Sequence, residues 1–253
     1  MSWQGRAWLG SGVLVYCGYV GIAQEHRHAA HQLVIACEPE PALAVRVRGQ
    51  HFGPSRSFAI PGGVSHCLTK ELASSDVVAL TVYLDVDTAA GARVTAMMRS
   101  LPPAQWSAAG EELTRAWPID ATSEASDESI RTLIAHVQND RASTSLVHEY
   151  VRRAVEVAAR DIGSSLRLHR VAAEVGVSGS HLSRLWRSEL GLSFNSWVRW
   201  ERLREAARAI SAGSSITDAA HRAGFADGPH ASRVCREMFG LSPIELTTGV
   251  RVM

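Results

Sequence analysis

The hydrophobic and polar positions divide the chain into two parts with different periods. Up to about residue 86, short runs rich in β-branched and aromatic residues are separated by Gly and Pro, which is typical of strands joined by turns. A series of such runs predicts a small β-barrel or jelly roll. The expected strands cover residues 13–16, 32–36, 43–47, 57–60 and 77–83, with turn signals at 53–54 and 61–63.

Beyond residue 86 the hydrophobic positions recur at helical spacing. Helices are expected over residues 91–101, 127–137 and 146–162, with Ser126 capping the second. Residues 139–145 are expected to link two domains. The pattern predicts an α+β protein, whose expected parts are a β-barrel or jelly roll over residues 1–86, a helical extension and linker over residues 87–145, and an all-α domain over residues 146–253.

The all-α part contains one short segment twice. Residues 176–187 are matched by residues 225–236 at an offset of 49 positions, and each copy is followed by Gly-Leu-Ser. Two copies are too few for a solenoid, which needs about three or more repeats. We interpret them as one small module that is used twice on a single partner.

Each copy has the pattern of a helix, a tight turn and a second helix. Gly176 and Gly224 end the first helices, since Gly accepts the left-handed conformation at a helix C-terminus. Ser178 and Asp227 stand at the N-caps of the second helices, where a side-chain oxygen accepts a free backbone N–H. A capped second helix after a short turn is typical of a helix-turn-helix.

The second helix of each copy carries a polar face with Arg at matched positions. Arg pairs with guanine edges or binds phosphate, and Ser can contact either. One such face would be an ordinary solvated surface, but two matched faces favour DNA recognition. The candidate DNA-binding residues are Ser180, His181, Ser183, Arg184, Arg187, His230, Ser232, Arg233 and Arg236.

Residues 194–211 lie between the two copies and predict one long helix. At about 1.5 Å per residue this helix would be roughly 27 Å long. Neighbouring major-groove faces on one side of B-DNA lie about 34 Å apart. The connecting helix can therefore hold two recognition helices near one turn of DNA apart, with DNA bending to close the difference.

This arrangement resembles the C-terminal DNA-binding domain of the AraC-type transcription regulators over about residues 151–250. The matching motifs are Leu182-Ser183-Arg184, Gly191-Leu192-Ser193, Arg202-Leu203 with Ala206, Gly224-Phe225 and Gly240-Leu241-Ser242-Pro243. The resemblance implies a sequence-specific transcription regulator that binds double-stranded promoter DNA. It also allows RNA polymerase and a second copy of the chain as partners.

The second copy departs from the family pattern. Ala231 and Cys235 stand where such proteins usually carry Phe, and Pro229 stands where a polar residue is usual. Pro is tolerated in the first turn of a helix, so the helix is expected to persist. The lost aromatics predict a thinner local core. We expect the first copy to read sequence and the second to hold mainly the DNA backbone.

The net charge of +1 hides a split along the chain. From Tyr150 onward there are 15 Arg against 10 acidic residues, whereas the preceding part has 11 basic against 15 acidic residues. Basic charge alone supports only non-specific phosphate affinity. The four cysteines contain no Cys-x-x-Cys pair, which argues against a zinc ribbon. Free thiols, no leader peptide and no long apolar run lead us to expect a cytoplasmic protein without a membrane partner.

Two stretches of the N-terminal part, residues 26–32 and 61–66, resemble the paired motifs of the cupin fold, His-x-His-x3-Glu and Pro-x-Gly-x2-His. The resemblance implies a metal or effector site made by His26, His28, Gln32 and His66. His-x-His on a strand places both imidazoles on one face. Gln32 replaces the usual Glu and is a weaker ligand, but three imidazoles can still hold a divalent transition metal. Alternatively, the same side chains bind an organic effector or one another.

The sequence is compatible with three functions. The first is a regulator whose barrel senses a small molecule or metal and whose helical domain reads DNA. The second is a cupin-type metal-dependent enzyme or metal sensor, and the third is an architectural DNA-binding protein whose barrel only dimerises. An enzyme does not need a duplicated Arg-bearing module, and the histidine motif lacks a carboxylate for acid–base work. Both features favour the regulator and predict no enzymatic activity.

Overall fold

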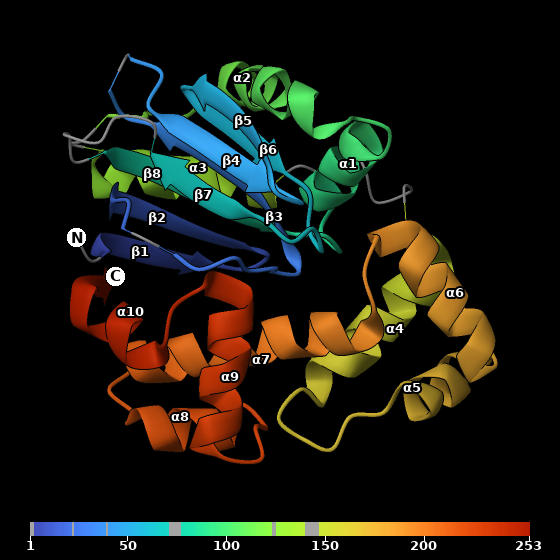
Figure 1. Ribbon diagram of the computed structural model, residues 1–253. Coiled ribbons are helices and arrows are strands. Elements are labelled where there is room, and N and C mark those ends of the chain that lie inside the picture. Colours follow the sequence, from blue (N-terminus) through green and yellow to red (C-terminus); the bar gives the residue numbers. More distant parts are fainter. Residues whose placement is uncertain (1–2, 22, 39, 71–76, 123–124, 140–146) are drawn as a thin grey trace.

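The computed structural model describes residues 3–21, 23–38, 40–70, 77–122, 125–139 and 147–253. Two β-sheets with flanking helices form the N-terminal part, which we call the β-domain. A bundle of helices forms the C-terminal part, which we call the helical domain, and it lies against one side of the β-domain (Figure 1). The expected α+β class with two structural parts is therefore confirmed, and the expected linker lies almost wholly outside the described residues.

The β-domain contains a six-stranded sheet of order β6-β3-β8-β2-β1-β9 and a three-stranded sheet of order β5-β4-β7. All five expected strands are present as β2, β3, β4, β6 and β8, with β8 beginning one residue later than expected. Strands β1, β5 and β7 were not expected, and Gly53-Pro54 lies inside β5 rather than between strands. The bounds are β1 (Gln4–Gly10), β2 (Val13–Tyr19), β3 (Ala30–Ala36), β4 (Leu43–Val47), β5 (Gln50–Ser55), β6 (Ser57–Ile60), β7 (Cys67–Lys70), β8 (Val78–Asp85) and β9 (Val250–Val252).

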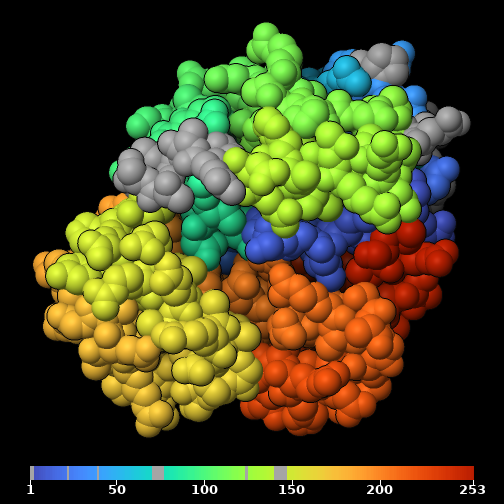
Figure 2. Space-filling view, turned by 180° about the vertical axis from the view of Figure 1, so that it is seen from behind, coloured from blue at the N-terminus to red at the C-terminus, as the bar shows by residue number. Residues whose placement is uncertain are grey.

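Among the described residues, three α-helices and one short 3-10 helix complete the β-domain. Helices α1 (Ala89–Met98) and α3 (Asp127–Gln138) were expected, and the Ser126 hydroxyl accepts the Ser129 N–H as the cap of α3. Helix α2 (Trp106–Ala116), which follows the 3-10 turn Pro103–Gln105, was not expected. Its buried Trp106 and Leu113 join the same hydrophobic core as the strands. Helix α3 covers the back of the domain in Figure 2.

The helical domain follows the expected order of elements. Gly176 ends α5 with φ of 83°, and the Ser178 hydroxyl accepts the His181 N–H at 3.2 Å at the start of α6. In the second unit Asp227 caps α9 in the same way, at 2.6 Å from the His230 N. The bounds are α4 (Glu149–Arg160), α5 (Leu168–Val175), α6 (Gly179–Leu190), α7 (Phe194–Ser211), α8 (Ile216–Arg222), α9 (Gly228–Phe239) and α10 (Pro243–Gly249).

Helix α7 connects the two helix-turn-helix units and also packs against the β-domain (Figure 1). The indole N–H of Trp200 donates to Asp85 Oδ1 at 2.7 Å, and that of Trp197 donates to Asp87 Oδ2 at 3.2 Å. Both indoles share a hydrophobic core with Tyr83 of β8. One side of the connecting helix is therefore part of the domain interface.

A second contact joins the domains at the C-terminal end of the described chain. Strand β9 pairs in parallel with β1, so that residues after α10 extend the sheet of the β-domain. Figure 2 shows this segment against the N-terminal strands. None of the described helices combines the length and apolar character needed to cross a bilayer.

Candidate functional sites

The polar faces of α6 and α9 are accessible. Arg184 and Arg187 of α6 and Arg233 and Arg236 of α9 are exposed, as is Ser180, while Ser183 and Ser232 are half-buried at the edges of these faces. The opposite faces are buried in the helical core through Leu182 and Trp186, and through Val234 and Met238. The fold thus presents the matched Arg pairs to solvent on two separate helices.

The two candidate histidines of these helices have partners inside the domain. The His181 ring lies 6.3 Å from the Tyr150 ring, and the His230 ring lies 5.5 Å from the Phe225 ring, both edge to face. Both histidines are half-buried. They help to pack the recognition helices as well as bordering the polar faces.

An apolar cavity of about 170 Å³ lies between the β-domain and the second helix-turn-helix unit. Ala231 and Cys235, the two small residues noted in the sequence of the second copy, line it and are buried. Other walls come from Tyr16 and Tyr83 of the β-domain. Leu203, Ala207, Ile210 and Phe239 close the cavity from the helical side. The two small residues could be recognised in the sequence, but the cavity that they help to form could not.

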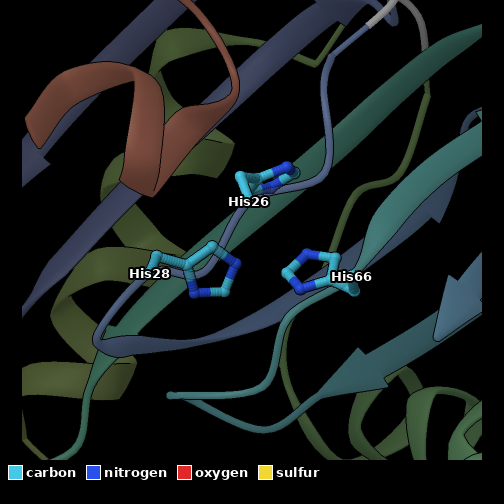
Figure 3. A group of neighbouring side chains, drawn as sticks. All are labelled: His26, His28 and His66. Carbon is cyan, nitrogen blue, oxygen red and sulfur yellow. The ribbon is translucent and has the colours of Figure 1, made fainter. Parts of the chain in front are cut away.

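The four candidate effector or metal residues come together in one place. His26, His28 and His66 offer ligand atoms that all lie within 4.8 Å of one another (Figure 3), and Gln32 lies beside them. All four side chains are buried. The sequence expectation that His26 and His28 share a strand face is wrong, because β3 begins only at Ala30. His26 instead forms an isolated β-bridge with His66, which brings the second motif to the first.

Backbone carbonyls fix the orientation of the three imidazoles. Nδ1 of His26 lies 2.8 Å from the Gln24 carbonyl, Nδ1 of His28 lies 2.7 Å from the Ala30 carbonyl, and Nδ1 of His66 lies 3.0 Å from the Val64 carbonyl. Burial lowers the pKa of His28 to about 3 and holds the pKa values of His26 and His66 below their usual range. A neutral imidazole carries one N–H, and each carbonyl requires it at Nδ1. Each Nε2 therefore carries a lone pair.

This arrangement is the one that metal-binding histidines adopt, since a ligating imidazole usually donates its other N–H to a carbonyl or carboxylate. Gln32 adds to the argument, because its Oε1 lies 3.0 Å from Nε2 of both His28 and His66. The Gln32 oxygen and the Nε2 lone pairs of His28 and His66 would repel one another. Either a cation lies among these atoms, or the amide turns and its NH2 group donates to both rings. The residues present thus fit a metal and also fit a metal-free network.

The histidine group contacts both domains. The His28 ring lies 5.1 Å from the Tyr83 ring and 6.3 Å from the Trp200 ring of α7, while His26 and Gln32 border the apolar cavity. The neighbouring His31 does not belong to the histidine group. Its Nδ1 accepts the Gly62 N–H at 3.1 Å and its Nε2 lies 2.8 Å from the Thr95 hydroxyl, so His31 joins β3 to α1.

Comparison with known proteins agrees with this geometry. Residues 171–248 match the model of a helix-turn-helix domain family. The Msm operon regulatory protein of Streptococcus mutans is 25% identical over 111 residues, which are 44% of this chain and 39% of that protein. The HTH-type transcriptional regulator YfiF of Bacillus subtilis, itself uncharacterized, is 36% identical over 84 residues, or 33% and 26% of the two chains. The chain thus spans less than two fifths of either relative.

Solved structures show a similar fold over nearly the whole chain. ToxT from Vibrio cholerae superposes with a TM-score of 0.55 at 11% identity, covering 94% of this chain and 98% of that one. A ToxT structure with a bound unsaturated fatty acid gives a TM-score of 0.57 at 11% identity over 98% of both chains. The C-terminal region accordingly contains a helix-turn-helix domain, and the chain has the two-part fold of ToxT.

Proposed function

We propose that this protein is a ligand-responsive, sequence-specific DNA-binding transcription regulator. The observation that carries the proposal is the pair of exposed Arg faces on α6 and α9, joined by the single helix α7. In this proposal Ser180, Ser183, Arg184 and Arg187 read the first major groove. Ser232, Arg233 and Arg236 contact the next groove, mainly at phosphates.

The proposed effector is a small apolar molecule that occupies the cavity between the domains. The cavity is lined almost wholly by hydrocarbon and aromatic side chains, and its volume of about 170 Å³ suits a compact apolar ligand. The fatty-acid-bound ToxT structure supports an apolar effector by analogy of fold. Both domains form the walls of the cavity. A ligand that binds this docked arrangement more tightly than other arrangements of the domains would therefore raise the population of the docked arrangement. That shift would change the placement of the second recognition helix.

Selection of DNA from a randomised pool with the full-length protein tests the proposal. We expect an enriched sequence that binds at least about 1,000-fold more tightly than a scrambled duplex at the same salt concentration. Adding a compact apolar ligand should change that affinity. Equal affinity for selected and scrambled DNA would leave only non-specific phosphate binding and would contradict the proposal.

A divalent transition metal is the second candidate ligand, held by His26, His28 and His66 with Gln32 as a fourth ligand. The converging Nε2 lone pairs favour it, whereas a turned Gln32 amide would make the group purely structural. Elemental analysis of untagged protein, followed by zinc or nickel titration of the chelator-treated protein, distinguishes a metal site from a purely structural histidine group. His28→Ala should abolish saturable metal binding without changing DNA affinity in chelator. Loss of folding in this variant would instead assign the histidine a structural role.

The metal candidate does not lead us to propose an enzyme. Among the described residues, the metal-ligating group consists of the three imidazoles, with no Asp or Glu. The proposed partners are double-stranded promoter DNA and the effector, with RNA polymerase and a second copy of the chain as further partners. Because a regulator of this kind must reach promoter DNA, we propose that the protein is located in the cytoplasm.

A further inference from the structure

A polar cleft of about 410 Å³ separates the β-domain from the first recognition helix. Its walls come from the segment before β3, the end of α6, the start of α7 and the last turn of α9. The cleft shares no lining residue with the apolar cavity. It is therefore a separate hollow with a different chemistry.

The cleft carries an excess of positive charge. Among the described residues, Arg27, Arg187 and Arg199 line it, with Glu237 as the single acidic lining residue. Arg199 Nη1 donates to Glu237 Oε2 at 2.5 Å, and Arg27 Nη2 lies 3.7 Å from Glu237 Oε1. Arg187 forms no ion pair with any residue that the structure describes. Three guanidinium groups against one carboxylate leave two positive charges, and a cleft concentrates their field.

The start of helix α7 is a second feature of the cleft, since Ser193 and Ser196 line it. Helix α7, with 18 residues, begins at this wall, where the Ser193 hydroxyl accepts the Ser196 N–H at 3.1 Å. The other free N–H groups of the first turn and the helix dipole favour an anion there.

We propose that this cleft binds a small oxyanion with two negative charges, of the dicarboxylate or phosphate class. Two charges match the excess of two guanidinium groups. The planar guanidinium fork suits both carboxylate and phosphate oxygens. Arg27 belongs to the β-domain and Arg187 to the first recognition helix, so the anion would hold these two parts together. Binding of the anion does not depend on the proposed function.

Calorimetric titration of the full-length protein tests the site without DNA. The probes are inorganic phosphate and malonate, each at fixed ionic strength and in the presence of a chelator. We expect saturable binding of at least one probe with a Kd below about 1 mM. Arg27→Gln and Arg187→Gln should each weaken it by about tenfold or more, since hydrogen bonds to charged groups are strong. Arg153→Gln, an exposed change on α4, is the matched control and should bind normally.

The two probes separate the ligand classes. Tighter binding of malonate assigns the site to dicarboxylates, and tighter binding of phosphate assigns it to phosphate compounds. Absence of saturable binding by both probes would overturn the proposal, as would equal affinity in all four proteins. Because no DNA is present, either result leaves the proposed regulator function standing.

Discussion

Arg204 of the connecting helix α7 forms a buried ion pair with Asp85 at the end of β8. Both side chains are almost fully buried, at 3% and 4% exposure. Arg204 also donates to the Gly10 carbonyl at 2.5 Å, and Trp200 donates to the same Asp85. The helix that joins the two helix-turn-helix units is therefore fixed to the sheet of the β-domain. Arg204 also borders the apolar cavity, so a ligand there contacts this junction directly.

Asp85→Asn should strongly destabilise the docked protein. The amide that replaces the carboxylate could still accept from Trp200, but it would leave the buried Arg204 charge without its main partner. Breaking a buried pair in this way costs about 3–5 kcal/mol in the free energy of unfolding. Urea unfolding measures the loss. Glu205→Gln is the control, because its pair with Arg208 is about two fifths exposed and is worth at most about 1 kcal/mol. Equal losses in the two variants would show that the buried pair does not hold the interface.

Arg184→Ala should reduce discrimination between selected and scrambled DNA. A bidentate contact between Arg and a base contributes about 1–3 kcal/mol. Competition binding with both duplexes measures the ratio of affinities. Unchanged discrimination would remove Arg184 from the base-reading residues.

Arg236→Ala provides the contrast for the second recognition helix. If Arg236 contacts phosphate, its loss should weaken all sequences alike and lower the slope of log affinity against log salt by about one. A loss confined to the selected sequence would reassign Arg236 to base reading.

The pH dependence of stability should depend on His31. Burial lowers the pKa of His31 to about 4, from 6.5 in an exposed chain. Below pH 6.5, His31 therefore binds a proton in the unfolded chain but stays neutral in the native state until the pH approaches 4. The free energy of unfolding falls as pH drops from 6.5 towards 4, by up to about 1.4 kcal/mol per pH unit for this group. His31→Gln should make that fall less steep in urea unfolding at several pH values with chelator present.

An exposed histidine of the same domain is the control for this experiment. His136 lies on the solvent side of α3, so His136→Gln should leave the pH slope unchanged. The same slope in the His31 variant and the native protein would mean that protonation of His31 does not oppose folding.

Cys235→Phe should close the apolar cavity. The Phe ring would occupy space between α9 and the β-domain, because Cys235 lines this cavity. We expect thermal stabilisation by benzene or short alcohols to disappear, although crowding could cost about 1–3 kcal/mol. Cys235→Ser keeps the cavity open and serves as the control. Stabilisation that persists in the Phe variant would place the ligand elsewhere.

Local signals explain why the helical domain was predictable. Gly176, Ser178 and Asp227 act on backbone groups within a few residues, so their roles can be read directly from the sequence. The motif around His26 and His28 likewise revealed the members of the histidine group. Its chemistry could not be inferred in advance, because the Nδ1 atoms are oriented by carbonyls that only the fold brings near.

The domain interface had no such local signal. Arg204 and Asp85 belong to distant segments, and an Arg on a long helix is ordinarily solvated. Strand β9 has three residues, too few for a periodic pattern, and pairs with the other end of the chain. Strand β5 was not recognised because most of its residues are exposed and because it contains Gly53-Pro54, which is ordinarily a turn signal. The Arg204–Asp85 pair and strand β9 depend on how the domains dock, which the hydrophobic pattern does not encode.

Hydroxyl-radical footprinting of the full-length protein on its selected DNA tests the double-groove claim most directly. Recognition helices at the two ends of α7 should protect two stretches on one face of the duplex, centred about 10–10.5 base pairs apart. Arg184→Ala should weaken protection of one stretch, and Arg233→Ala that of the other. A single protected stretch, unaffected by changes on α9, would contradict the account.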